Sequence, residues 1–282
     1  MLEREESIEQ TYFFRTLRER LPENMPLQDL LAQLRHEVLA TAKLPMAIDF
    51  LLSELKHAGV IGPAMKRLAH YFTPFQAYLV TEAENERGRF DMRIALEILE
   101  READYRAREP TRAGTFLFQF ETLCRNRLRY DPGLAASAAD PVFDEVWRDW
   151  ILSVRRQIGL LDLADLMYVA SAHYDTQQAR RRKTEEPSQR PILFGEKEGQ
   201  IALANRRKDP LYLFAALQRH LGYPAVPRRR PRDETPDMLP QVLRRLEKLE
   251  TRLKMLEEEQ RNDAIDLTKF YRPPEGSEGV GE

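Results

Sequence analysis

From Arg4 to about Arg182, apolar residues recur at spacings of three and four in one segment after another, and proline or glycine interrupts the pattern between segments. This spacing is the period of an α-helix with one apolar face. Each such helix must bury its apolar face against another element, so the chain is constrained to an assembly of packed helices. The predicted fold class is all-α, with a multihelical bundle-like body, a small helical appendage and a C-terminal coiled-coil helix.

The amino-acid composition agrees with a helical protein that folds in water. Only 12 glycines stand against 18 prolines, which excludes doubly wound sheets with glycine-rich phosphate loops. No stretch approaches the roughly 20 consecutive apolar residues of a membrane span. The single cysteine, Cys124, excludes an intrachain disulfide framework, and the acidic N-terminal residues lack the pattern of a secretion signal. We therefore expect a cytoplasmic protein without a membrane partner.

Local signals mark individual helices. In Thr73-Pro74 and Asp209-Pro210, a side-chain oxygen can accept a backbone amide proton, while proline takes the first helical position, where no donor is needed. Both pairs therefore predict helix starts. The apolar stripe with the clearest helical spacing consists of Phe143, Trp147, Trp150, Ile151, Val154 and Ile158.

The stretch from Thr111 to about Arg129 allows two interpretations. Its apolar content and length predict a helix. However, Phe116, Phe118 and Phe120 alternate with other residues, which is the period of a β-strand. We predict a helix and keep a short strand as the alternative.

Two segments interrupt the helical pattern and divide the chain. Between Arg180 and Pro191, apolar residues give way to charge and proline, which predicts a linker or long loop. A second stretch, from Gly222 to Pro236, combines prolines with arginines and predicts a moderately stiff linker. The predicted organisation is a multihelical body at 1–182, a linker with a small helical pair at 183–224, a Pro/Arg-rich linker at 225–236, a coiled-coil helix at 237–261 and a flexible tail at 262–282.

The most specific pattern in the chain is a short run of heptads near the C-terminus. Spacings of 3, 4, 3, 4 and 3 separate six apolar residues, and this alternation is typical of a coiled-coil seam. We call these residues the leucine seam: Leu239, Val242, Leu246, Leu249, Leu253 and Leu256. The seam spans fewer than three heptads, and Leu243 widens its apolar face, so a higher oligomer or packing within the chain stays an alternative.

Charged residues beside the leucine seam favour a parallel pairing of two copies. With Leu239 at position a, Arg245 and Arg252 occupy g positions, and Glu250 and Glu257 occupy e positions. In a parallel pair, each g residue meets the following e residue of the partner, so arginine faces glutamate. An antiparallel self-pair would place arginine against arginine. The pattern therefore predicts a parallel homo-oligomer, or pairing with another coiled-coil partner.

No motif in the sequence specifies catalysis, a metal or a cofactor. Glu54 and His57 have the Glu-x-x-His spacing of di-iron sites, but such a site needs a second copy and two further glutamates, so we interpret them as part of an exposed polar face. No Gly-x-Ser-x-Gly, Walker or Rossmann pattern occurs. Cys124 lies in an apolar stretch and is interpreted as a packing residue. We predict no catalytic residue, no metal ligand and no cofactor.

Basic residues are concentrated in the middle of the chain. Residues 179–232 carry a net charge of +9, against −6 for 1–178 and −5 for 233–282. Such runs can neutralise the phosphates of nucleic acid, but no aromatic residues interleave with them as in a single-strand platform. We prefer a solvated linker, or a patch that meets the acidic body of a neighbouring subunit. The candidate basic patch consists of Arg180, Arg181, Arg182, Lys183, Arg206, Arg207, Lys208, Arg228, Arg229, Arg230 and Arg232.

These patterns lead to a functional hypothesis. The heptads and the missing catalytic motifs predict a non-enzymatic interaction or scaffold protein that self-associates through the leucine seam. A first alternative is a nucleic-acid-associated factor that uses the basic segment 179–232. A second is a helical enzyme whose site assembles from residues distant in sequence.

Overall fold

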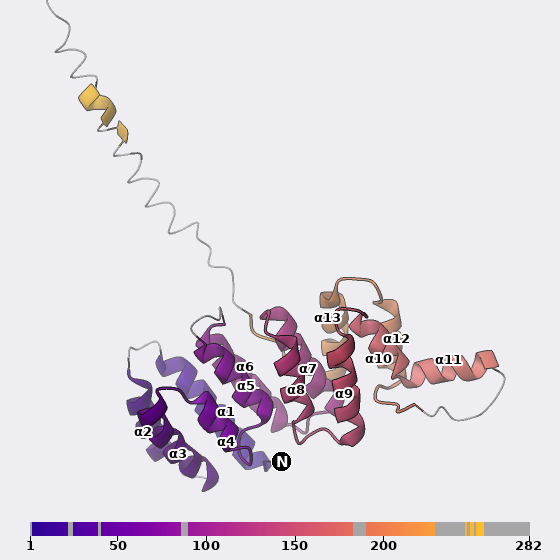
Figure 1. The fold of residues 1–282 in the computed structure, drawn as a ribbon, viewed down its shortest axis with the longest axis horizontal. Coiled ribbons are helices and arrows are strands. Elements are labelled where there is room, and N and C mark those ends of the chain that lie inside the picture. Colours follow the sequence, from indigo (N-terminus) through magenta and orange to yellow (C-terminus); the bar gives the residue numbers. More distant parts are fainter. Residues whose placement is uncertain are drawn as a thin grey trace, which may run out of the picture. The chain divides into compact units, whose positions relative to one another are not determined.

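The computed structural model describes residues 2–21, 25–38, 41–85, 90–182 and 190–228, together with 246, 249–250 and 252–256. These residues form helices joined by turns and loops, and the described part of the chain contains no β-strand beyond isolated bridges. The all-α prediction is confirmed. Two compact units divide the chain, Met1–Arg229 and Arg230–Glu282. Figure 1 shows the helices of the first unit, labelled α1 to α13.

The helices of the first unit follow one another with short connections. The first six are α1 (Arg4–Arg20), α2 (Leu27–Glu37), α3 (Lys43–Ala58), α4 (Gly62–Arg67), α5 (Pro74–Glu84) and α6 (Met92–Arg106). The others are α7 (Arg112–Arg125), α8 (Tyr130–Ala138), α9 (Glu145–Gln157), α10 (Leu163–Val169), α11 (Ala172–Arg182), α12 (Glu196–Ala204) and α13 (Pro210–Leu221). Among the residues described, none of the helices has both the length and the apolar character needed to cross a membrane.

The N-terminal helices pack around α1. α1 lies along α6 and also contacts α3, while α2 packs on α3. The apolar face of α1 buries Phe13 and Leu17 in the core. On its polar side, Arg20 donates to Glu37 Oε1 at 2.7 Å, and the Tyr12 hydroxyl donates to Glu37 Oε2 at 2.8 Å. These hydrogen bonds fasten the end of α2 to α1.

Side-chain caps begin several helices. Thr73 Oγ1 accepts the Gln76 amide proton at 3.3 Å, and the Gln76 side chain accepts from the Thr73 amide at 3.1 Å, which completes a capping box. Asp209 Oδ1 accepts from the Leu211 amide at 2.9 Å. Both predicted helix starts are confirmed. Four further helices begin in the same way, with Asp91, Thr111, Asp144 and Asp162 as capping residues.

α7 is a central helix of the unit, and the alternative of a strand there is wrong. Phe116, Phe118 and Phe120 all lie on α7 and are buried. Residues two apart point to different faces of a helix, so their common burial means that α7 is covered on several sides. α6, α8 and α13 provide this cover. α8 comes especially close, because a Cβ at Gly133 would lie 2.5 Å from a methyl group of Leu123.

α4 forms where glycine and proline predicted only a break. Pro63 fits the first turn of a helix, since the backbone donor that it lacks would have no intrahelical partner there. The amides of Ile61 and Gly62 donate instead to the carboxylate of Glu84 on α5, at 2.6 and 2.9 Å. The cap of α4 therefore comes from a residue distant in sequence. Burial raises the pKa of Glu84 above its ordinary value, although these two amides act in the opposite direction.

A buried polar network joins α6, α7 and the residues before α9. Arg106 donates to Glu102 Oε1 at 3.0 Å and forms an ion pair with Asp140. Gln119 Nε2 donates to both carboxylates, at 3.0 Å each. Burial alone would lower the pKa of Arg106, but the two carboxylates outweigh it and raise the pKa. The arginine therefore stays charged inside the protein and holds three segments together.

The residues after α10 belong to the same compact unit as the body. α12 packs against α10 and α11, and α13 packs against α7 and α12. Beyond α13, the hydroxyl of buried Tyr223 donates to Glu121 Oε2 of α7 at 2.9 Å. Asn126 Nδ2 donates to the carbonyl of Pro227 at 3.1 Å. Residues 222–228 are thereby fastened to α7.

Candidate functional site

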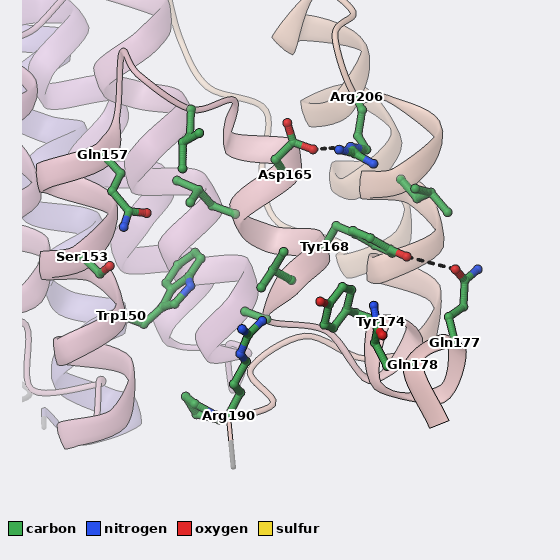
Figure 2. Close-up of a pocket in the computed structure, with 16 residues that line it drawn as sticks. Trp150, Ser153, Gln157, Asp165, Tyr168, Tyr174, Gln177, Gln178, Arg190 and Arg206 are labelled. Atoms are coloured by element: carbon green, nitrogen blue, oxygen red, sulfur yellow. Dashed lines mark hydrogen bonds and ion pairs between the residues drawn. The ribbon is translucent and has the colours of Figure 1, made fainter. Parts of the chain in front are cut away.

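A cavity of about 850 Å³ opens between α9, α10, α11 and α12 (Figure 2). Its volume lies within the roughly 300–1,000 Å³ that is typical of ligand pockets. We call it the α9–α12 pocket. Its lining combines aromatic rings, guanidinium groups and carboxamides on Trp150, Tyr168, Tyr174, Arg190, Arg206, Gln157, Gln177 and Gln178.

α9 forms one wall of the pocket. Trp150, Ser153 and Gln157 line it at helical spacings of three and four, which place them on one face. The indole of Trp150 packs edge-on against Phe116 and Phe194, with ring centroids 5.0 and 5.2 Å apart. Trp150 remains half-buried and also lines the cavity. The predicted apolar stripe therefore supplies both the core and a pocket wall.

α10 and α11 form the opposite wall, shown on the right of Figure 2. Tyr168 and Tyr174 meet edge to face, with ring centroids 5.2 Å apart and planes at 89°. The Tyr168 hydroxyl donates to Gln177 Oε1 at 3.0 Å. Gln177 Nε2 lies 3.0 Å from His173 Nε2. These contacts hold the tyrosine pair in place.

Two arginines lie over these two tyrosine rings. The Cζ atom of Arg190 is 5.9 Å from the ring centroid of Tyr174, and that of Arg206 is 5.7 Å from the centroid of Tyr168. Both distances fall within the roughly 6 Å of a cation–π contact. Arg206 also forms an ion pair with Asp165 of α10. Asp165 thus fixes Arg206 against α10, whereas Arg190 is exposed at the mouth of the pocket.

The segment 190–194 returns the chain to the pocket after α11. The Ala172 amide donates to the carbonyl of Phe194 at 2.9 Å. The Phe194 ring is buried and packs on Trp150. This anchoring places Arg190 at the cavity, at the end of the segment in which the sequence predicted a linker.

A glycine allows α12 to approach α11 closely. A Cβ at Gly199 would lie 2.6 Å from the Cβ of His173, which is closer than real side chains come. Nδ1 of His173 lies 2.5 Å from Oε1 of Glu196 and forms a hydrogen bond with it. This hydrogen bond lowers the pKa of Glu196 below its ordinary value. α11 and α12 are therefore closely packed and hydrogen-bonded at His173, next to Tyr174 of the pocket wall.

A second hollow of about 640 Å³ adjoins the α9–α12 pocket. The two share Trp150, Ser153, Arg190 and Pro191. Glu145 and Asp149 of α9 line the second hollow together with Arg190, whereas Asp165 is the carboxylate that lines the α9–α12 pocket. Arg190 therefore borders both hollows, and the second hollow differs from the first in having two carboxylates of α9 in its lining.

The structure separates the residues of the candidate basic patch. Arg206 lines the α9–α12 pocket, and Arg180 is exposed near the end of α11, three residues beyond Gln177. Arg207 has a left-handed backbone with φ of 59°, held by a hydrogen bond from its amide to Asp162 Oδ2 at 2.9 Å. Lys208 follows it and is exposed. Arg181 and Arg182 continue α11.

The remaining basic residues lie elsewhere. Arg228 is exposed and follows Pro227, whose carbonyl accepts a hydrogen bond from Asn126 at the end of α7. Its neighbourhood is therefore not the α9–α12 pocket. Lys183, Arg229, Arg230 and Arg232 lie outside the described residues.

In the second unit, the described part of the leucine seam is helical. Its side chains are exposed, at 51% for Leu246, 56% for Leu249, 58% for Leu253 and 56% for Leu256. Glu250 and Arg252 are helical and exposed as well. Leu239, Val242, Arg245 and Glu257 lie outside the described residues.

The sequence also singled out Glu54 and Cys124. Glu54 Oε2 pairs with Arg67 Nη1 at 2.7 Å. Within the described residues, no three His, Cys, Asp or Glu side chains converge in a way that could hold a metal ion. The Cys124 thiol accepts a hydrogen bond from the Tyr130 hydroxyl at 3.2 Å, and burial raises the pKa of the thiol to about 11. Cys124 is therefore a thiol, not a thiolate, at neutral pH.

Sequence reasoning missed the residues that build the pocket. Tyr168 and Tyr174 stood in no motif, Arg190 lay in a predicted linker, and Trp150 was predicted only as part of the apolar stripe of a helix. The only available signal was their residue type, since aromatic residues and arginine are enriched at binding surfaces. Comparison of the chain with models of protein families, with curated proteins and with solved structures finds no match.

Proposed function

We propose that this chain is a non-enzymatic interaction protein that self-associates through the leucine seam. The supporting observation is that Leu246, Leu249 and Leu253 lie on a helix and are each more than half exposed. Exposed leucines at consecutive a and d positions are unfavourable in water, and burial of apolar surface contributes about 25 cal/mol per Å². A partner helix with the same seam buries them by knobs-into-holes packing.

The proposed partner is a second copy of this chain in parallel orientation. The described residues Glu250 and Arg252 occupy e and g positions and are exposed, so both can reach across such an interface. In the parallel register, Arg245 meets Glu250 and Arg252 meets Glu257. Every e–g contact that these four residues make is then attractive.

Light scattering on the full chain tests this proposal. The wild-type protein is expected at a multiple of the 33.0 kDa chain mass. A variant with Leu249→Asp and Leu253→Asp is expected at the mass of one chain, because two buried charges at the seam cost more than the association supplies. A chain that ends at Pro236 lacks the seam and is expected to behave in the same way.

A matched control separates the seam from general effects of new surface charge. Leu160 is 84% exposed and belongs to the first unit. Leu160→Asp therefore introduces the same charge on an exposed leucine away from the seam and is expected to keep the wild-type mass. A wild-type protein of one chain mass, or an unchanged mass in the seam variant, would contradict self-association through this helix.

A further inference from the structure

The α9–α12 pocket has the chemistry of a site for a flat ring attached to an anion. Trp150 stands on one side and Tyr174 on the other, and Figure 2 shows the guanidinium of Arg190 between them. We propose that this pocket binds single-stranded nucleic acid, with a base against Trp150 or Tyr174 and a phosphate at Arg190. This inference is independent of self-association through the leucine seam.

The aromatic residues provide the surface for a base. Stacking on an aromatic side chain is a common way of binding an unpaired base, because every base has a π-face. Trp150 and Tyr174 are half-buried and line the cavity, so each combines a fixed position with an accessible surface. The contacts of Trp150 with Phe116 and Phe194 keep the indole in place.

Carboxamides near the rings can pair with the edge of a base. Gln157 and Gln178 both line the cavity, from α9 and α11. Among the described residues, neither side-chain amide has a hydrogen-bond partner. A carboxamide donates and accepts at once, which suits the mixed donors and acceptors of a base edge.

The arginines provide the charge for a phosphate backbone. Arg190 is exposed at the mouth of the pocket and lies over Tyr174. Arg206 is already paired with Asp165 and stacked on Tyr168, so its main contribution is to hold that wall. Arg180 lies three residues beyond Gln177, which lines the cavity, so both residues are on the same face of α11. Arg180 therefore extends the positive surface along this helix.

Charge also favours a strand over a single nucleotide. Arg180 lies near the end of α11, and Arg207 and Lys208 follow α12; both helices border the pocket, and all three side chains are exposed. A free nucleotide would use only the arginines that line the cavity, whereas a strand also reaches Arg180, Arg207 and Lys208. The carboxylates of Glu145 and Asp149 in the neighbouring hollow repel phosphate. The strand is therefore expected to extend from Trp150 toward α11 and α12.

No aromatic residue interleaves with the basic runs in the sequence, and this pattern disfavours binding of a single strand. The fold removes the objection. Tyr168 and Tyr174 come from α10 and α11 and lie beneath arginines that follow later in the chain. The fold thus brings aromatic and basic residues together, in the order Arg190, Tyr174, Tyr168 and Arg206, although they are not interleaved in the sequence.

Fluorescence anisotropy on the full-length chain tests the proposal with a labelled oligothymidylate of about 12 nucleotides, at about 50 and 200 mM salt. Binding is expected at the lower salt concentration and to weaken as salt is raised. Arg190→Ala and Tyr174→Leu are each expected to raise Kd about tenfold, through loss of a phosphate contact and of a stacking surface. Leucine keeps most of the tyrosine volume, and Arg190 is exposed, so both variants are expected to fold.

Arg67 is a matched control, because its Cζ atom also lies over an aromatic ring, Phe50, at 4.9 Å. It also pairs with a carboxylate, and Arg67→Ala is expected to leave Kd within about twofold of wild type. Asp149→Asn removes a repulsive carboxylate near the pocket and is expected to tighten binding. If Arg67→Ala and Arg190→Ala raise Kd by the same factor, the proposal is overturned.

Two competitors distinguish the source of the binding energy. Heparin carries charge without bases, and thymidine monophosphate carries one base and one phosphate. Tyr174→Leu is expected to weaken binding of the oligonucleotide but not binding of heparin. Thymidine monophosphate is expected to compete poorly with the labelled strand. The proposal is overturned if the labelled strand does not bind at the lower salt, if Tyr174→Leu leaves oligonucleotide binding unchanged, or if the mononucleotide binds as tightly as the strand.

Discussion

Phe194 packs edge-on against Trp150, with ring centroids 5.2 Å apart and ring planes at 68°. This contact joins the segment 190–194 to the face of α9 that lines the α9–α12 pocket. It has two effects at once, because the same tryptophan lines the α9–α12 pocket and the same segment places Arg190 at its mouth. The shape of the pocket therefore depends on a residue that does not line it.

Phe194→Ala is expected to destabilise the protein and disturb the pocket. Phe194 is 1% exposed and also contacts Trp147, so its loss leaves a cavity in the core. A free-energy loss of about 3–5 kcal/mol is expected for such a change, measured by urea unfolding. Ile192→Ala is the control, because Ile192 is 56% exposed in the same segment, and it should change stability by less than about 0.5 kcal/mol. Equal effects of the two variants would contradict the anchoring role of Phe194.

Arg106→Met is expected to lower the free energy of unfolding by about 3–5 kcal/mol, because it leaves Glu102 and Asp140 as buried carboxylates without their cation. Chemical denaturation measures the change. Arg108, two residues after Arg106, is the control. Its side chain pairs with Asp104 at 2.7 Å but is 71% exposed. Arg108→Ala should cost less than about 1 kcal/mol. A small effect at Arg106 would show that the buried network is not needed for stability.

Glu37 is expected to make stability depend on pH in the acid range. Its hydrogen bond from Arg20 holds its pKa below the ordinary value of 4.5, with help from Tyr12 and against partial burial. A lowered pKa in the folded state stabilises the fold above pH 4.5, and this contribution is lost as the pH falls through the folded-state pKa. Glu37→Gln should therefore cost up to about 1 kcal/mol at pH 7, and this cost should shrink as the pH falls below 4.5 and through the folded-state pKa. Unfolding curves across this range test it, and a constant difference between the two proteins would contradict it.

Cys124 is expected to resist alkylation in the native protein. With its pKa raised to about 11 by burial, only about one thiol in a thousand is ionised at about pH 8. Mass spectrometry after iodoacetamide treatment should therefore show slow labelling, about a hundredfold slower than in denaturant, where the thiol regains its ordinary pKa. Native and denatured rates that agree would disprove the raised pKa.

The direction of the proposed coiled coil can be tested by exchanging charges. Arg252→Glu places glutamate against Glu257 in a parallel pair and is expected to weaken association by about 0.5–1 kcal/mol per contact. The double variant Arg252→Glu with Glu257→Arg should restore it. Analytical ultracentrifugation measures both. In an antiparallel pair the single change would relieve repulsion between arginines, so tighter association would contradict the parallel arrangement.

Several helices could be predicted because their signals are local. The Thr73 and Asp209 caps act on amides within three residues, and the stripe around Trp150 repeats within every turn of α9. α4 could not be predicted in this way, because the carboxylate that caps it comes from Glu84 on α5. The alternating phenylalanines of α7 were ambiguous for a related reason, since burial on several sides removes the helical period.

The sequence by itself determined the all-α class, the helix caps and the positions of the leucine seam, since each follows from residues a few positions apart. The tertiary structure decided the α9–α12 pocket. Trp150, Tyr174 and Arg190 line one cavity because α9, α11 and the segment 190–194 pack together, with Phe194 of that segment buried against Trp150. Periodicity and capping act along the chain, whereas a pocket depends on which helix faces meet, and no local pattern specifies that.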